Sequence, residues 1–191
     1  MTLRVVTVSG SLRDPSTTSA LLDAIAGELG RLVPTTRESV ELAPLAADLA
    51  VAVTGGQNSP DVDAALAAVA AADVLVVATP IYRGSYTGLF KLFFDLVHQD
   101  ALVGTPVLLA AGGGNDQHAL AIDHELRPLF AFFRAATIPA GVYARPGDYA
   151  ADASGAKRVD PAGPLAAAVE RAVASALPLL PPLPPLPGSP R

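Results

Sequence analysis

Hydrophobic residues along this chain follow two patterns, short continuous runs and stripes with a spacing of three or four. Residues 3–8 form an apolar run, and similar runs occupy residues 74–78 and 106–111. Runs of this kind are typical of parallel strands that are buried on both faces. Weaker runs at residues 37–42 and 140–144 complete a set of five predicted strands.

Helical spacing separates these strands. Leu21, Leu22, Ile25 and Leu29 form one stripe, and Gly30 is expected to end that helix. Alternating strands and helices predict a doubly wound α/β fold, a parallel sheet with helices on both faces. In such a sheet, a ligand binds beyond the carboxyl ends of the strands. The other helices are expected at residues 60–71, 86–98, 118–134 and 165–177, with long loops at 44–59, where a helical turn would fit, and at 146–161.

The composition favours one compact domain over residues 1–177. The chain has 191 residues, of which 51% are hydrophobic and 16% charged, so it can bury a sizeable core. Its net charge of −5 argues against nucleic acid as a partner, because a nucleic-acid binder needs a basic face. Cysteine is absent, and neither a secretion signal nor a membrane span is apparent, so a cytoplasmic location is expected. The proline-rich residues 178–191 predict a flexible polyproline II tail, with recognition by a partner as the alternative.

The loop after the first predicted strand has the chemistry of a phosphate site. It combines short hydroxyl side chains with Gly10, which allows close backbone approach, and Arg13, whose guanidinium matches phosphate geometry. The start of the following helix adds free backbone N–H groups. The spacing fits neither a nucleoside triphosphate loop nor a dinucleotide fingerprint. The terminal phosphate of a mononucleotide is therefore predicted here.

The loop after the third predicted strand, residues 79–87, suits a flat heteroaromatic ring. Pro80 and Gly84 restrict its backbone, while Tyr82 and Ser85 offer planar and hydrogen-bonding groups. The alternative is that these aromatic residues only begin a helix core, and the helical spacing of Phe90, Phe93 and Phe94 favours a core or interface role for those three.

Together, these loops resemble the NAD(P)H-dependent FMN reductases of the flavodoxin-like superfamily. The resemblance covers roughly residues 3–145 and implies a five-stranded parallel sheet in the order 2-1-3-4-5. It is closest to the two-component reductases that supply reduced FMN to alkanesulfonate and other luciferase-like monooxygenases. The matching segments are Ser9-Gly10-Ser11-Leu12-Arg13 with Ser16, Pro80-Ile81-Tyr82-Arg83 with Ser85-Tyr86-Thr87-Gly88 and Lys91, and Gly113-Gly114 with His118.

The resemblance also implies a flavin site. The FMN phosphate would lie against Ser9, Ser11, Arg13, Ser16, Thr17 and Thr18. The isoalloxazine would be bordered by Pro80, Ile81, Tyr82, Arg83, Gly84 and Ser85, with Gly112, Gly113, Gly114 and His118 on its other side, where nicotinamide stacks. Family members often carry asparagine at the position of Thr18 and threonine at that of Gly112.

His124 is the residue that bears on the resemblance to the two-component reductases. In the two-component reductases, the matching position carries an inserted aromatic residue that forms a π-bulge at the tetramer interface beside the flavin site. The resemblance implies that His124 favours flavin as a substrate that leaves, and it makes His118 and His124 candidate modulators. A surface or interface histidine without a catalytic part is the alternative.

The expected chemistry is hydride transfer from NAD(P)H to FMN, which requires two stacked rings and no catalytic side chain. No metal site is expected, because His118, Asp123 and His124 lack the spacing of a zinc motif. The FMNH2 formed would pass to a flavin-dependent monooxygenase. Two alternatives remain: a quinone, azo or metal reductase that retains FMN, and a non-enzymatic FMN-binding electron carrier. Aromatic residues concentrated in two helices favour a homodimer or homotetramer.

Overall fold

A parallel sheet forms the centre of the computed structural model, which describes residues 2–13, 15–151, 153 and 155–181. The main strands are β1 (Leu3–Ser9), β2 (Thr35–Glu41), β3 (Val74–Pro80) and β4 (Pro106–Gly112). Together with β5 (Ala136–Thr137), they lie in the order β2-β1-β3-β4-β5, and every pairing in this sheet is parallel. The predicted doubly wound fold and strand order are confirmed.

The prediction of a single fifth strand at residues 140–144 is wrong in one detail, because the structure has two short strands in this region. β5 pairs with the start of β4, and β6 (Val142–Ala144) pairs with its end. Pro139 lies between the two short strands. Proline has no N–H group to donate to a strand ladder, so a break at this position is expected.

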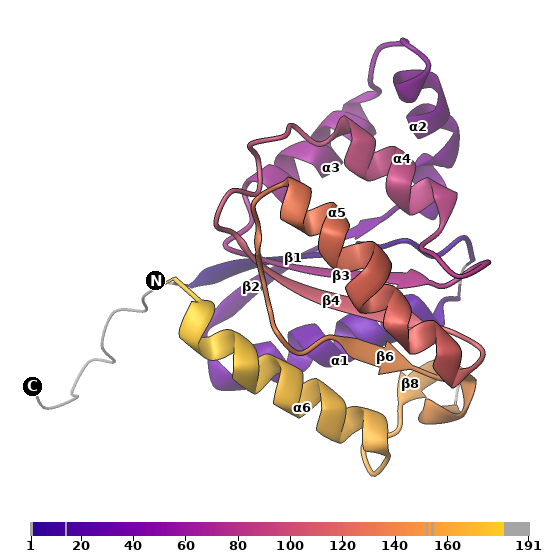
Figure 1. Cartoon of the computed structure of the whole chain (residues 1–191), viewed down its shortest axis with the longest axis vertical. Coiled ribbons are helices and arrows are strands. Elements are labelled where there is room, and N and C mark those ends of the chain that lie inside the picture. Colours follow the sequence, from indigo (N-terminus) through magenta and orange to yellow (C-terminus); the bar gives the residue numbers. More distant parts are fainter. Residues whose placement is uncertain (1, 14, 152, 154, 182–191) are drawn as a thin grey trace, which may run out of the picture.

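Helices cover both faces of the sheet (Figure 1). On one face lie α1 (Thr17–Leu32) and α6 (Pro164–Ala176), and on the other lie α2 (Ala46–Val53), α3 (Pro60–Ala70), α4 (Gly88–Leu96) and α5 (Arg127–Phe132). Each face of the sheet has its own buried apolar cluster. Phe90, Phe93 and Phe94 are core residues, and the ring centroids of Phe94 and Phe130 lie 5.0 Å apart between α4 and α5.

Two predicted loops contain secondary structure. Residues 44–59 hold most of a short 3-10 turn (Ala43–Leu45) and all of α2, whose alanine-rich sequence suits a helix and whose Leu49 is fully buried. Residues 146–161 hold another 3-10 turn (Pro146–Asp148) and an antiparallel hairpin of β7 (Tyr149–Ala151) and β8 (Lys157–Val159). The hairpin packs against α1 rather than joining the main sheet.

Several predicted helix bounds also change. The first helix passes Gly30 and ends at Leu32, because the N–H of Val33 still bonds the carbonyl of Leu29. The long helix expected at residues 118–134 divides into a 3-10 turn (Asp116–Leu120), a π-helical turn (Ile122–Leu126) and α5. The π-bulge implied at His124 is therefore present. A final 3-10 turn (Leu177–Leu179) follows α6.

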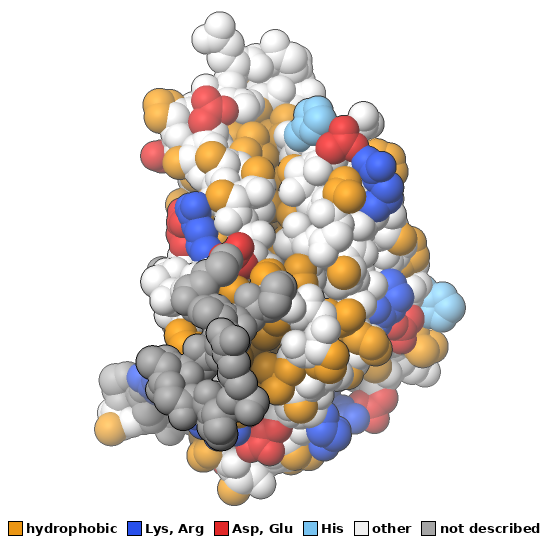
Figure 2. Space-filling model, turned by 90° about the vertical axis from the view of Figure 1, so that its left-hand side faces the viewer, with side chains coloured by type: hydrophobic (Ala, Val, Ile, Leu, Met, Phe, Trp, Pro, Cys, Tyr) orange, Lys and Arg blue, Asp and Glu red, His pale blue; other side chains and the backbone are white. Residues whose placement is uncertain are grey.

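Ion pairs are spread over the surface. They include Arg4 with Glu38 at 2.6 Å and Arg37 with Asp23 at 2.6 Å. On the side shown in Figure 2, basic and acidic side chains lie next to one another rather than in patches of a single charge. No helix in the described part of the chain is long and apolar enough to cross a membrane. The predicted tail falls mostly in residues 182–191, outside the described residues.

Candidate functional site

Three predicted loops meet at the carboxyl edge of the sheet, because β1, β3 and β4 are neighbours. Ser9 is in register with Ala78, and Pro80 with Gly112. Each loop is also bonded to its neighbouring strand or loop. Thr87 Oγ1 donates to the carbonyl of Gly10 at 2.9 Å, and the N–H of Ile81 donates to the carbonyl of Gly112 at 2.7 Å.

The hydroxyl groups of the first loop are mostly bonded within the protein. Ser9 is fully buried, and its Oγ lies 3.1 Å from Ser19 Oγ. Ser11 Oγ donates to the carbonyl of Arg13 at 3.0 Å and accepts from its N–H at 3.1 Å, which folds the loop back on itself. The buried hydroxyls therefore shape this loop, while the Arg13 side chain remains exposed at its surface.

The start of α1 carries the other predicted phosphate contacts. Ser16 is the N-cap, and its Oγ accepts hydrogen bonds from the N–H groups of Thr18 and Ser19. Because that oxygen accepts twice, its own proton is free to donate outward. Thr18 is buried, whereas Thr17 is exposed.

Gly10 is required for the close packing of this loop. A Cβ at that position would lie 2.8 Å from Phe90 Cδ2 and 2.9 Å from Thr79 Oγ1. Real Cβ atoms essentially never approach other atoms so closely, so a side chain would push the first loop away from the second. The glycine thus sets the distance between the two loops.

The second loop is a tight turn. Tyr82 and Ser85 exchange backbone hydrogen bonds of 2.9 and 3.3 Å, and the two residues between them have positive φ angles, 56° for Arg83 and 88° for Gly84. This combination is typical of a type I′ turn. Tyr82 is 44% exposed, while Pro80 and Ile81 at the base of the loop are half-buried and buried.

Ser85 links this turn to the π-helical turn. Its Oγ donates to Glu125 Oε2 at 2.9 Å, across a separation of 40 residues. The sequence reasoning missed Glu125, because which residue faces the loop depends on the π-helical register. His124, the predicted residue in that turn, is exposed. The structure therefore brings Glu125 to the site edge rather than the His124 side chain.

The third loop is packed tightly around Gly113. A Cβ there would lie 2.9 Å from His118 Cβ and would overlap the hydroxyl of Tyr143, which donates to the carbonyl of Asn115. His118 Nδ1 is buried and has no hydrogen-bond partner among the described residues. Such an atom is costly to leave unpaired, so it is available to a ligand. Gly112 is half-buried, and Gly114 is exposed.

Electrostatics around the site keep its phenols neutral. Burial raises the pKa of Tyr86, against the opposing effect of Lys91, and Glu125 adds a smaller rise. Burial likewise raises the pKa of Tyr143 and, most strongly, that of Tyr149. A phenol is already neutral at pH 7, so these rises leave the three hydroxyls as hydrogen-bond groups.

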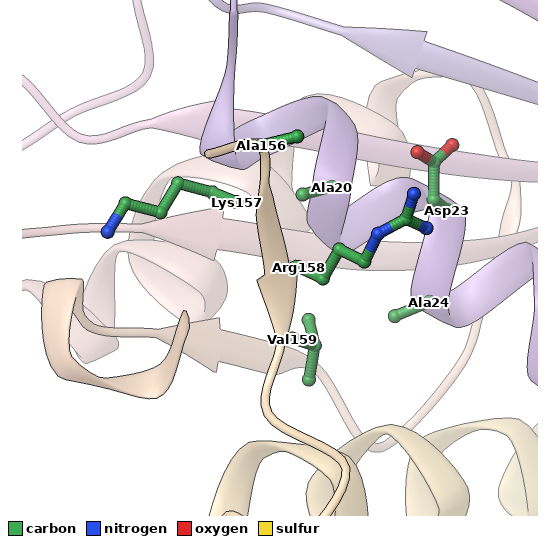
Figure 3. A pocket seen from close by; sticks show the side chains of 7 residues that line it. All are labelled: Ala20, Asp23, Ala24, Ala156, Lys157, Arg158 and Val159. Carbon is green, nitrogen blue, oxygen red and sulfur yellow. The ribbon is translucent and has the colours of Figure 1, made fainter. Parts of the chain in front are cut away.

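A hollow of about 340 Å³ lies beside this site, between α1 and β8 (Figure 3). Arg158 points toward Asp23 of α1, while Lys157 points to the opposite side. None of the predicted site residues lines this hollow. It is a separate surface feature formed by the hairpin, which the sequence reasoning had interpreted as a loop.

Comparison with known proteins identifies the family. The strand order defines a flavodoxin-like α/β protein with its site at the carboxyl edge of the sheet. The family model for NADPH-dependent FMN reductase matches residues 3–150, and the chain belongs to this family. It is therefore an oxidoreductase that uses FMN and NAD(P)H.

Individual relatives agree with this assignment. The chain is 48% identical over 146 residues to "FMN reductase (NADPH)" of Pseudomonas aeruginosa, covering 76% of this chain and 78% of that one. It is 51% identical over 143 residues to "NADH-dependent FMN reductase SfnF" of Pseudomonas putida, covering 74% and 77%. A solved oxidoreductase from Corynebacterium diphtheriae superposes with a TM-score of 0.78 at 32% identity, covering 94% and 97%. One of these relatives is named for NADPH and the other for NADH.

Gly113→Ala tests the packing of the third loop. We expect a fall of roughly 10- to 100-fold in kcat/KM for FMN, because the new Cβ must displace His118 or Tyr143 and so misplace the site. Steady-state oxidation of NADPH measures this effect. Gly147→Ala is the matched control, because a Cβ at Gly147 meets nothing within 4 Å. Unchanged kinetics in Gly113→Ala would show that the third loop is not part of the site.

Proposed function

We propose that this enzyme binds FMN as a substrate, reduces it with NAD(P)H and releases FMNH2 to a partner flavin-dependent monooxygenase. The observation that carries the proposal is the π-helical turn Ile122–Leu126, which contacts the second loop through Glu125 and Ser85. π-helical turns are rare and are frequent at functional sites. The resemblance to two-component reductases associates such a turn with flavin that leaves after reduction.

The residues at the sheet edge fit FMN. Gly10 and Gly113 leave no room for side chains, so they let the three loops pack closely around the proposed site. The unpaired His118 Nδ1 supplies a buried polar atom. The proposed FMN site consists of Ser11, Arg13, Ser16, Thr17 and Thr18 for the phosphate, Pro80, Ile81, Tyr82, Arg83, Gly84 and Ser85 for one side of the ring, and Gly112, Gly113, Gly114 and His118 for the other. Ser9, which is fully buried against Ser19, supports the phosphate loop from within.

Within this site, each loop has a distinct task. Bound FMN supplies the hydride acceptor, and the nicotinamide supplies the hydride. Arg13 and the first turn of α1 neutralise the phosphate, as cations and helix N-termini do elsewhere. The second and third loops hold the ring so that one face remains open to the nicotinamide. Exposure of Tyr82, Arg83 and Gly84 at the rim supports a site that a ligand can leave.

Arg13→Ala tests phosphate recognition. We expect the KM for FMN to rise roughly 10- to 100-fold, because a charge-assisted hydrogen bond is lost. The KM for riboflavin, which has no phosphate, should stay unchanged. Arg171→Ala, an exposed arginine on α6, is the control. An equal rise in the KM for FMN and in the KM for riboflavin would argue against a phosphate contact at Arg13.

Release of flavin is tested directly on the purified enzyme. We expect protein separated by gel filtration to be colourless, with initial rates that follow a sequential mechanism when FMN and NADPH are varied. A monooxygenase present in the same assay should consume the FMNH2. Retained yellow FMN together with ping-pong kinetics would instead support the reductase that keeps its flavin, and absence of NAD(P)H oxidation would support an electron carrier.

We further propose that the enzyme is a homodimer or homotetramer in the cytoplasm. A hollow of about 470 Å³ between α4 and α5 is lined largely by apolar side chains, including Phe94, Leu129 and Phe133. Phe132 lies at the same place and is 66% exposed, which is unusual for a large aromatic residue. A second copy of the chain would bury this face.

Phe132→Asp tests the subunit contact. We expect sedimentation velocity to show an oligomer for the unaltered protein and a monomer for the variant, because a buried carboxylate would oppose association. Leu179→Asp changes a residue that is 41% exposed next to α6 on the other side of the sheet, and it should leave the oligomer intact. An unaltered protein that sediments as a monomer would contradict the proposal.

A further inference from the structure

We propose that Glu125 is a positioning residue of the FMN site, which acts through Ser85 to hold the Tyr82–Ser85 turn in place. The proposal rests on the proposed location of FMN at this turn. Its structural basis is the hydrogen bond of 2.9 Å from Ser85 Oγ to Glu125 Oε2. A carboxylate acceptor makes this bond stronger than one between neutral groups.

The π-helical turn is what directs Glu125 to the loop. Three consecutive polar residues of this turn have three different environments. Asp123 pairs with Arg127 at 2.9 Å, His124 is exposed, and Glu125 is half-buried against Ser85. The extra residue in a π-helical turn rotates the side chains that follow it relative to a regular α-helix, so it selects which residue of this stretch faces the site.

This turn is itself fixed to the sheet. Arg127, the residue directly after it, donates to the carbonyl of Ile138 at 3.1 Å and to that of Pro139 at 3.1 Å. These carbonyls lie between β5 and β6, beside β4. Glu125 therefore belongs to a segment that is anchored to the sheet. A residue that positions a binding loop must itself be held rigidly in this way.

The second loop has two anchors with different roles. Thr87, at its end, is buried and bonds both Thr79 Oγ1 and the carbonyl of Gly10. The tip of the turn is exposed, and Arg83 adopts a positive φ of 56° that non-glycine residues rarely adopt. Thr87 fixes the base of the loop, so the bond between Ser85 and Glu125 determines where the tip lies relative to the ring.

The experiment compares Glu125→Ala, Ser85→Ala and Glu125→Gln. We expect the first two to raise the KM for FMN about 10-fold with little change in kcat, because they loosen binding without altering the transfer of hydride. Glu125→Gln should restore most of the lost FMN binding, since its neutral amide oxygen still accepts from Ser85, although more weakly than a carboxylate. The double variant Glu125→Ala/Ser85→Ala should be no worse than either single variant, because both remove the same bond.

Asp123→Asn is the control, because Asp123 lies in the same π-helical turn but pairs with Arg127 instead of the second loop. An unchanged KM in Glu125→Ala or Ser85→Ala, or a Glu125→Gln variant as impaired as Glu125→Ala, overturns the proposal. Ser85→Ala decides the question if Glu125→Ala does not fold. Failure of the unaltered enzyme to saturate with FMN contradicts the proposed function instead, so the two failures are distinguishable.

Discussion

The parallel pairing of β1, β3 and β4 is the constraint on which the site depends. The backbone bonding of this sheet continues past the end of each strand. Gly10 donates to the carbonyl of Ala78 at 2.8 Å, Ile81 to that of Gly112 at 2.7 Å, and Gly113 to that of Ala144 at 3.0 Å. Each donor is the first residue of a loop. The loops therefore begin from positions fixed by the sheet, and buried backbone groups that would otherwise lack partners are satisfied.

Two glycines allow the loops at this edge to pack closely. Gly10 and Gly113 each occupy positions where a Cβ would collide with neighbouring side chains, so their main chain lies directly against the side chains of Phe90 and Thr79 or of Tyr143 and His118. The hydroxyls of Ser9, Ser11 and Ser16 are bonded inside the protein and stabilise the loop. Hydride transfer requires two rings held at reacting distance, and a rigid backbone frame meets that requirement without an acid or base among the side chains.

The sequence predicted the parts of this frame that depend on local burial. β1, β3 and β4 were found to within two residues, because strands covered on both faces are continuously apolar. The helix α2 was expected only as a turn within a loop, because its alanine-rich segment lies between Pro44 and the glycine pair Gly55 and Gly56, which indicate a loop. The β7–β8 hairpin was missed because its strands are only three residues long, and its packing on α1 leaves no local pattern in the sequence. All three loops of the site were located, because each follows a recognisable strand, whereas the contact of Glu125 with Ser85 spans 40 residues and leaves no local pattern.

The segment around the π-helical turn contributes to two surfaces. In a regular α-helix, Asp123 and Arg127 would face the same side, and Glu125 would lie well around the helix from both. Here the ion pair of Asp123 and Arg127 persists at 2.9 Å, while Arg127 reaches the carbonyls beside β4 and Glu125 reaches the second loop. His124 is left exposed between them. One short turn therefore carries an ion pair, precedes an anchor to the sheet and contacts the second loop.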